Sequence, residues 1–137
     1  MKKFLFVFFC VLSWSLSAQE KSGFQVSSHI LDISQGNPAG NVVVTLEKLD
    51  ESTRKWTPLS KKTTDNNGRI SDFLPYAKGT ENNGTYKLIF STGDYYKSKK
   101  IETFYPSVEI IFQIKDKEHY HVPISLSPFG YSTYRGS

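Results

Sequence analysis

The sequence predicts an all-β protein, an antiparallel Greek-key β-sandwich of eight strands in two sheets with one short helix. Many short segments alternate apolar and polar residues, as strands with one buried face do. Runs rich in Gly, Pro, Asn and Asp separate these segments at regular spacing, as the turns of a sandwich do. No repeat, low-complexity tract or interdomain linker interrupts the pattern, so one domain is expected.

The first 18 residues have the order of a secretory signal peptide. Lys2 and Lys3 are followed by nine apolar residues, 4–12, and then by a stretch that ends in small residues at Ala18. A membrane span needs about 20 apolar residues, so this run is too short for an anchor. We expect a signal peptide at residues 1–18 and a single domain at residues 19–137. The exported domain is then periplasmic or secreted and is not held in the membrane.

Composition argues against a disulfide-stabilised domain and against a nucleic-acid-binding domain for the exported part of the chain. The one cysteine, Cys10, lies inside the predicted signal peptide, so disulfides do not contribute and a packed core or oligomerisation must supply stability. The formal charge of +4 falls to +2 without Lys2 and Lys3. That excess is small, and no stripe of Lys and Arg with interleaved aromatic residues is present, so a nucleic-acid partner is not expected.

The amino-terminal half predicts three strands. Residues 24–31 alternate, with His29 on the face opposite Val26 and Ile30. Residues 32–40 contain two glycines and a proline and predict a loop. The valine-rich residues 41–49 form the second strand. Residues 55–64 form the third, and Pro58 places it at a sheet edge because proline cannot donate to a ladder.

A tight turn at residues 65–68 follows, so Arg69 opens the fourth strand. An irregular polar connection at 76–83 leads into the fifth strand at 84–91. Thr92 or Asp94 is expected to cap one short helix that ends near Lys99. Residues 108–114 form the sixth strand.

Two strands at the carboxyl end complete the set of eight. In the first of them, alternation puts His119, His121, Pro123 and Ser125 on one face. The intervening residues are Tyr120, Val122, Ile124 and Leu126, and they form the core face. After the turn at 127–130, residues 131–134 form the last strand.

Histidine is the side chain suited to proton transfer near neutral pH, so the histidine face is a candidate site. His119 and His121 point the same way, but no carboxylate or thiol completes a usual metal set, so neither metal nor cofactor is expected. Taken alone, His29 and Arg69 are ordinary exposed residues, and Tyr134 is an ordinary packing residue.

The motif at the carboxyl end of the chain gives these residues a specific functional interpretation. His121-Val122-Pro123 and the terminal Tyr-Arg-Gly-Ser of residues 134–137 resemble the signature of the 5-hydroxyisourate hydrolases, also called transthyretin-like proteins. An amino-terminal motif agrees at six positions, namely His29, Leu31, Asp32, Gly36, Pro38 and Ala39. Asn67-Gly68-Arg69 stands where the family has Asp-Gly-Arg, and Asn keeps the turn chemistry. Ser125 differs from the apolar residue of many relatives.

The resemblance implies a prealbumin-like sandwich that opens the ring of 5-hydroxyisourate with water. It implies catalytic roles for His29, Arg69, His121 and Ser137, and substrate-binding roles for His29, Arg69, Tyr134 and Arg135. It also implies a homotetramer with its sites at subunit interfaces. Whether His29 or His121 takes the first proton is left open.

Two other classes share the predicted architecture. Transthyretin has this fold and carries a hormone and retinol-binding protein without hydrolase activity. A secreted adhesion or accessory module is the third possibility. The two imidazoles, the arginine and the terminal tetrapeptide together favour the enzyme over both, since transthyretin lacks them at these positions.

Overall fold

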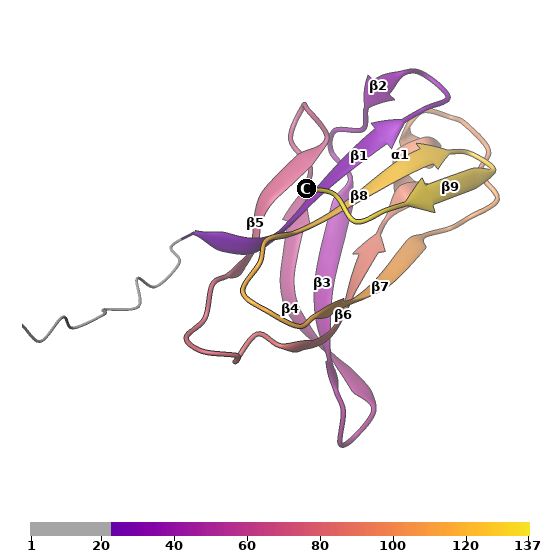
Figure 1. Cartoon of the computed structure of the whole chain (residues 1–137). Helices are drawn as coiled ribbons and strands as arrows, with labels where there is room; N and C mark the ends of the chain where they lie inside the picture. Colours follow the sequence, from indigo (N-terminus) through magenta and orange to yellow (C-terminus); the bar gives the residue numbers. More distant parts are fainter. Residues whose placement is uncertain (1–22) are drawn as a thin grey trace, which may run out of the picture.

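The computed structural model describes residues 23–137, so the predicted signal peptide lies outside the described residues. Two sheets face each other, and one short helix lies at one end of them (Figure 1). The strands are β1 (Phe24–Asp32), β2 (Asn37–Pro38), β3 (Val43–Asp50), β4 (Lys55–Thr63), β5 (Arg69–Pro75), β6 (Gly84–Phe90), β7 (Val108–Ile114), β8 (Tyr120–Ser127) and β9 (Gly130–Thr133), and the helix is α1 (Thr92–Ser98).

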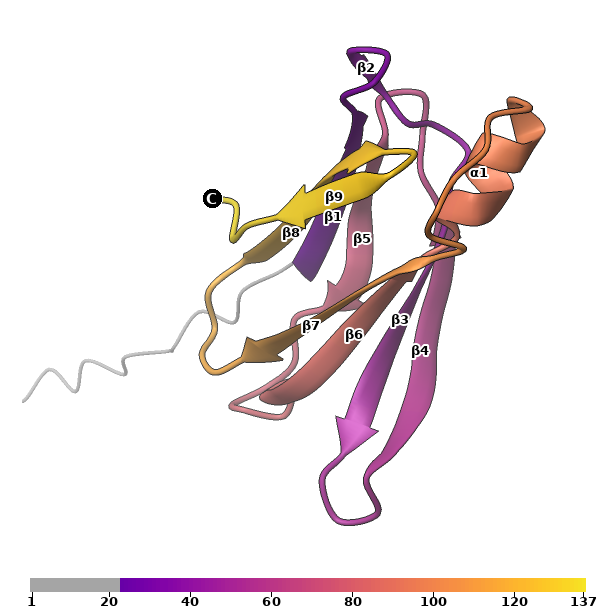
Figure 2. The same cartoon turned by 90° about the vertical axis from the view of Figure 1, so that its right-hand side faces the viewer.

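One sheet contains β5, β1, β8 and β9, with β2 added beside β1, and the other has the order β4-β3-β6-β7. Figure 2 shows the two layers, which splay apart toward the turn between β3 and β4. The predicted alternation is confirmed, because the inward residues of both sheets form one core. Its most buried aliphatic residues include Val26, Ile30, Val42, Val44, Leu46, Leu88, Val108, Ile114, Ile124 and Leu126. Each such side chain contributes roughly 1.5–3 kcal/mol by leaving water.

The strand count and one strand direction differ from the prediction. The described chain holds nine strands, because Asn37 and Pro38 in the predicted loop pair with Asp32 and Leu31. In addition, β1 and β8 run parallel, within a sandwich that was expected to be antiparallel. Parallel neighbours need a long crossover, and more than eighty residues separate these two strands. Alternation within a strand does not encode its direction relative to a distant partner.

The helix covers the end of the core. It begins at Thr92 with Ser91 as its N-cap, so the predicted caps Thr92 and Asp94 were wrong, and Ser91 makes no side-chain capping bond. Its own Tyr95 and Tyr96 side chains are buried, and the Tyr95 hydroxyl donates to Asp32 Oδ2 at 2.9 Å. Burial raises the pKa of the Tyr95 phenol above its usual range, so this donor keeps its proton. Within residues 23–137 no helix has the length and apolarity to cross a membrane.

The edge position predicted for the strand containing Pro58 is confirmed, since β4 is the outer strand of its sheet. The β3–β4 register shifts here, because Leu46 pairs with Ser60 and Glu47 with Pro58, so that Leu59 of β4 is left out of the pairing. An edge strand can accommodate a residue without N–H because that side of the strand needs no partner.

The turn at residues 65–68 sets the position of Arg69. Asp65 Oδ1 accepts hydrogen bonds from the N–H groups of Asn67 (2.8 Å) and Arg69 (2.9 Å). Gly68 has φ of +70°, and a Cβ there would lie 2.5 Å from the carbonyl oxygen of Ile30 on β1. The turn is thus pressed against β1, and only glycine fits at this position.

Replacing Gly68 with Ala is expected to destabilise the fold by more than the strained φ alone, because the added methyl group collides with backbone. Gly36 is the matched control, since its φ is +69° with nothing within 4 Å of an added Cβ. Gly36→Ala should cost about 1–2 kcal/mol, and Gly68→Ala roughly 1–3 kcal/mol more. Urea unfolding measures both variants, and equal losses would contradict the close approach.

Candidate active site

The predicted site residues on the strands gather on the outer face of the β5-β1-β8-β9 sheet. In the parallel β1–β8 ladder, Ser27 pairs with His121 and His29 pairs with Pro123. In the antiparallel β1–β5 ladder, His29 pairs with Arg69. Directly paired residues project to the same side of a sheet. Since Ser28 and Val122 between them are buried, His29, Arg69 and His121 share the opposite, solvent-facing side.

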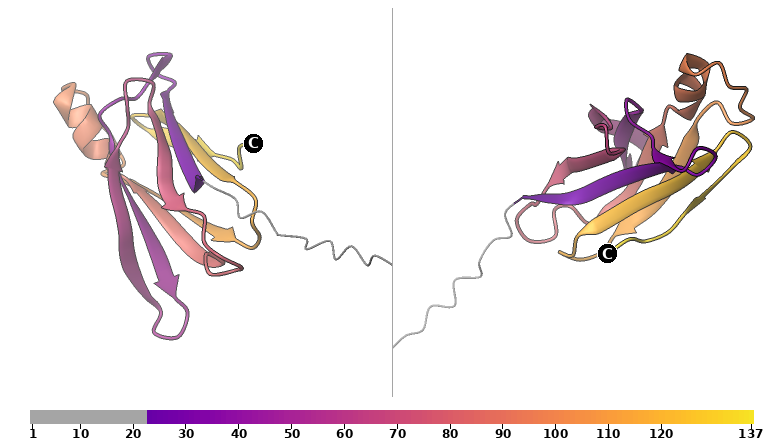
Figure 3. Two further views of the ribbon diagram at one scale, coloured as in Figure 1. Left: turned by 90° about the vertical axis from the view of Figure 1, so that its left-hand side faces the viewer. Right: turned by 90° about the horizontal axis from the view of Figure 1, so that it is seen from above.

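The register of the β8–β9 hairpin brings the carboxyl-terminal segment back to His121. Ile124 pairs with Thr133, and three residues further along each strand His121 forms a bridge with Gly136. Between these points the ladder is interrupted, because Pro123 has no N–H to donate. The Thr133 hydroxyl donates instead to the Pro123 carbonyl at 2.8 Å. The chain end is therefore fixed at His121. Figures 2 and 3 show it on the side of the sheet away from the other layer.

Gly136 is the contact point between the chain end and the histidine. Its N–H donates to the His121 carbonyl at 2.9 Å. A Cβ at this position would overlap the His121 ring. The glycine of Tyr-Arg-Gly-Ser is thus required by space, since φ here is not in the positive region. Ser137 follows directly and is exposed beside the site.

Burial and positive charge keep the two site histidines neutral. Burial lowers the pKa of His121, the guanidinium of Arg69 lowers it further, and any proton taken up by His29 or His119 would act in the same direction. Burial likewise lowers the pKa of His29, with a second contribution from Arg69 that a hydrogen bond to the Asn67 backbone and the Asp65 charge oppose. Neutral imidazoles can accept protons at pH 7, and the guanidinium beside them can stabilise negative charge.

Ser27, which the sequence pattern alone does not single out, connects two histidines. Its Oγ lies 2.8 Å from His119 Nε2 and 2.8 Å from His121 Nδ1. The second ring nitrogen of His119, Nδ1, lies 3.1 Å from the Phe24 carbonyl oxygen. The alternating face that holds His29 also holds Ser27, but only the parallel register brings it to His121.

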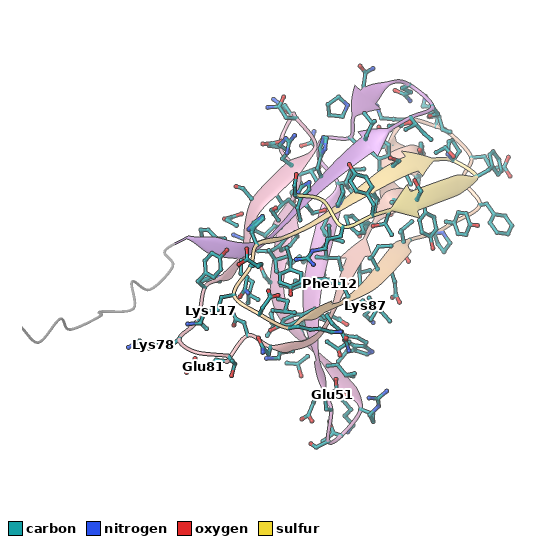
Figure 4. The ribbon with its side chains drawn as sticks, viewed as in Figure 1. Glu51, Lys78, Glu81, Lys87, Phe112 and Lys117 are labelled. Carbon is teal, nitrogen blue, oxygen red and sulfur yellow. The ribbon has the colours of Figure 1, made fainter. Side chains whose placement is uncertain are left out.

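Two predicted residues lie along a groove at the sheet edge. The Arg135 guanidinium stacks on the Tyr120 ring at 4.9 Å, and Tyr134 is 63% exposed. Both line a groove of about 590 Å³ between β7 and the carboxyl-terminal segment, together with Phe112, which Figure 4 labels. The structure therefore brings together His29, Arg69 and His121 with the chain end. The substrate-binding roles of Tyr134 and Arg135 stay predictions.

Among residues 23–137 no group of three or more His, Cys, Asp or Glu side chains is arranged to hold a metal ion. The expectation of a site without metal or cofactor stays a prediction. The chemistry available from these side chains is acid-base catalysis with electrostatic support of an oxyanion.

A two-sheet sandwich with imidazoles, a guanidinium and the chain end on the outside of one sheet defines a transthyretin-like protein equipped for acid-base chemistry. The family model described as "HIUase/Transthyretin family" matches residues 26–136, and the chain belongs to this family. A probable 5-hydroxyisourate hydrolase of Caenorhabditis elegans is 47% identical over 82% of this chain and 81% of its own.

Solved structures agree. The 5-hydroxyisourate hydrolase of Klebsiella pneumoniae superimposes with a TM-score of 0.68 at 34% identity, covering 85% of this chain and all of its own. Sea bream transthyretin in complex with thyroxine gives a TM-score of 0.74 at 26% identity, covering 82% and 94%. The scaffold is thus shared between a hydrolase and a thyroxine-binding protein, and the site residues must distinguish them.

The lowered pKa values make a prediction about Arg69. NMR titration should show His29 and His121 titrating below the ordinary value of 6.5, and Arg69→Gln should raise both pKa values. Arg54→Gln in the β3–β4 turn, where Arg54 pairs with Glu51, is the matched control and should leave both unchanged.

The same shifts predict how stability depends on pH. A histidine whose pKa is depressed in the folded state binds its proton more readily when unfolded. The free energy of unfolding should therefore be maintained above about pH 6.5 and fall as pH drops below that value. Titration of both histidines at or above the ordinary pKa would contradict the arrangement.

Proposed function

We propose that this protein is a 5-hydroxyisourate hydrolase. The observation that carries the proposal is the convergence of His29, Arg69 and His121 on one exposed sheet face, with the Tyr-Arg-Gly-Ser end fixed to His121. Family membership and the printed names of the relatives agree with this activity. The reaction opens the ring at an amide bond with water and gives 2-oxo-4-hydroxy-4-carboxy-5-ureidoimidazoline.

The residues divide the work as follows. One neutral imidazole takes a proton from the attacking water, which positioned acid-base catalysis accelerates by roughly 10²–10⁴-fold. Arg69 presents a planar fork of donors to the ring oxygens and supports the negative charge that develops on the attacked carbonyl. The protonated imidazole then returns its proton to the leaving nitrogen. Ser137, exposed at the chain end beside His121, acts with the imidazoles on the substrate, and Tyr134 and Arg135 contact the substrate from the neighbouring groove.

The alternative is a transthyretin-like carrier of a small ligand. The likeness to sea bream transthyretin concerns the scaffold, which both functions share. A carrier needs a hollow of the right shape, and it has no use for two neutral imidazoles placed beside a guanidinium. We therefore favour the enzyme.

For the assembly we propose a homotetramer with its sites at subunit interfaces. The edges beside the carboxyl-terminal hairpin are the candidate interfaces: β7 is an edge strand of one sheet and β9 is an edge strand of the other. Exposed apolar side chains lie on or near these edges, namely Phe104, Ile111, Phe129, Tyr131 and Tyr134. Isologous pairing of such edges is common in homo-oligomers. Sedimentation equilibrium tests this, and a monomeric mass at micromolar concentration would contradict it.

For the location we propose export to the periplasm or beyond, which the signal-peptide pattern of residues 1–18 supports. Amino-terminal sequencing of the protein recovered from its native cells tests this. Recovery of the intact chain from Met1 would contradict it.

The activity is tested by following the ultraviolet decay of freshly generated 5-hydroxyisourate. The protein should accelerate decay beyond the spontaneous rate, and His121→Ala should lower turnover by about 10²–10⁴-fold. Deleting residues 134–137 should also abolish acceleration. A carrier or module would give the spontaneous rate with every variant.

A glycine pair refines the same assay. Gly136→Ala should impair turnover because the methyl group displaces the chain end from His121. Gly130→Ala in the same hairpin is the control, since the nearest atom to its added Cβ, Ser127 Oγ, is 3.8 Å away. Circular dichroism should show both variants folded.

A further inference from the structure

We propose that Ser27 and His119 are positioning residues that hold the proton of neutral His121 on Nδ1, leaving its Nε2 as the base that activates water. This inference rests on the proposed hydrolase function and assigns which histidine takes the first proton. It is carried by a chain of three hydrogen bonds that begins at a main-chain carbonyl and ends at His121.

The donor-to-acceptor direction of these three hydrogen bonds follows from the Phe24 carbonyl at which they begin. The carbonyl oxygen of Phe24 can only accept, so the Nδ1 of His119, 3.1 Å away, must donate. A neutral imidazole has one N–H, so the Nε2 of this His119 is an acceptor. The Ser27 hydroxyl faces this nitrogen at 2.8 Å. Its single O–H must therefore donate a hydrogen bond to His119 Nε2.

The second half of the chain is then determined. Because the only O–H of Ser27 is used in the hydrogen bond to His119, its oxygen can only accept in the hydrogen bond with His121. The His121 nitrogen on that line, Nδ1 at 2.8 Å, must carry a proton. In neutral His121 this leaves Nε2 with a free lone pair, and no group in the described part of the chain hydrogen-bonds to it.

The surroundings of His121 favour the neutral form on which this argument depends. Burial lowers the pKa of His121, and Arg69 on β5, His29 on β1 and His119 just before β8 add positive or potentially positive charge that lowers it further. His119 is exposed, and its protonation state decides in which direction the Ser27 hydroxyl donates its hydrogen bond. A protonated His119 would donate from both nitrogens, turn the Ser27 hydroxyl toward Nδ1 of His121, and move the His121 proton to Nε2.

A purely structural role for Ser27 is the competing explanation, and the neighbouring residue provides its control. The Ser28 hydroxyl also links β1 to β8, donating at 2.8 Å to the Val122 carbonyl, but it is buried on the opposite face. Losing the Ser28 hydroxyl removes one hydrogen bond and losing the Ser27 hydroxyl removes two, each at a cost of about 1 kcal/mol, so both variants test the same kind of link to β8. Only Ser27 is connected to an imidazole.

The experiment measures the tautomer of His121 in the full mature chain by ¹⁵N NMR of its ring nitrogens. It is done near pH 8, above the ordinary histidine pKa of roughly 6.5. The wild-type protein and Ser28→Ala should show the proton on Nδ1. Ser27→Ala should lose this preference, Ser27→Thr should restore it, and His119→Ala should move the proton toward Nε2 because Ser27 is then free to donate.

Kinetics supply the second readout. Ser27→Ala and His119→Ala should lower kcat about 10-fold to 100-fold, by analogy with the loss when the hydrogen-bond partner that orients a metal-bound imidazole is removed, with KM nearly unchanged. Ser28→Ala should leave both constants near wild type. A proton on Nε2 of His121 in the wild-type protein, or wild-type kcat in Ser27→Ala, overturns the proposal.

The two proposals fail in different ways. The NMR measurement uses no substrate, so it decides the tautomer even if the wild-type protein does not accelerate 5-hydroxyisourate decay. A wild-type enzyme that is active while Ser27→Ala matches it in kcat and tautomer would refute the positioning role and leave the hydrolase function standing.

Discussion

The parallel ladder between β1 and β8 is the constraint on which the rest of the structure depends. It joins residues 94 positions apart, as in the contact of Ser27 with His121. Because side chains alternate along a strand, a slip of one residue would turn His29 or His121 into the core and expose a core neighbour. The apolar residues on the inner face therefore enforce the register that assembles the outer face. Core packing and site geometry are fixed by the same pairing.

Pro123 is the reason that the carboxyl end of the chain reaches the site on the outer face of β1 and β8. A proline in a ladder removes one donor, so β9 cannot run its full length along β8. The segment separates from β8 after Thr133 and rejoins it at Gly136, with Tyr134 and Arg135 between. This interruption gives those side chains access to the groove beside β7. Terminal residues usually fray, but here a main-chain bond to His121 and the lack of a side chain at Gly136 hold the end in place.

Much of this was predictable from local pattern. The strand at β7 has the predicted bounds, the turn before Arg69 is where its Asn and Gly residues indicated, and the edge position of Pro58 is confirmed. The direction of β8 relative to β1 was not predictable, because no local feature records it. Ser27 was missed for the same reason: a serine beside a histidine motif has meaning only once the register is known. The identification of Arg69 and His29 came from family motifs, since each residue alone resembles an ordinary surface residue.

The separation of core and site explains how one scaffold serves different functions. Inner-face residues of β1, β5 and β8 hold the two layers together, and outer-face residues make almost no contribution to that packing. The outer face can therefore change from a ligand-binding surface to a catalytic one while the fold is retained. Arg69 shows why the catalytic version needs several residues at once. Burial lowers the pKa of both site histidines and the charge of Arg69 lowers it further, which keeps the imidazoles neutral and able to accept a proton, and the same charge is available to an oxyanion. An imidazole in this place without Arg69 would be a weaker partner for the reaction, because it would be protonated at a higher pH and no fixed cation would face the attacked carbonyl.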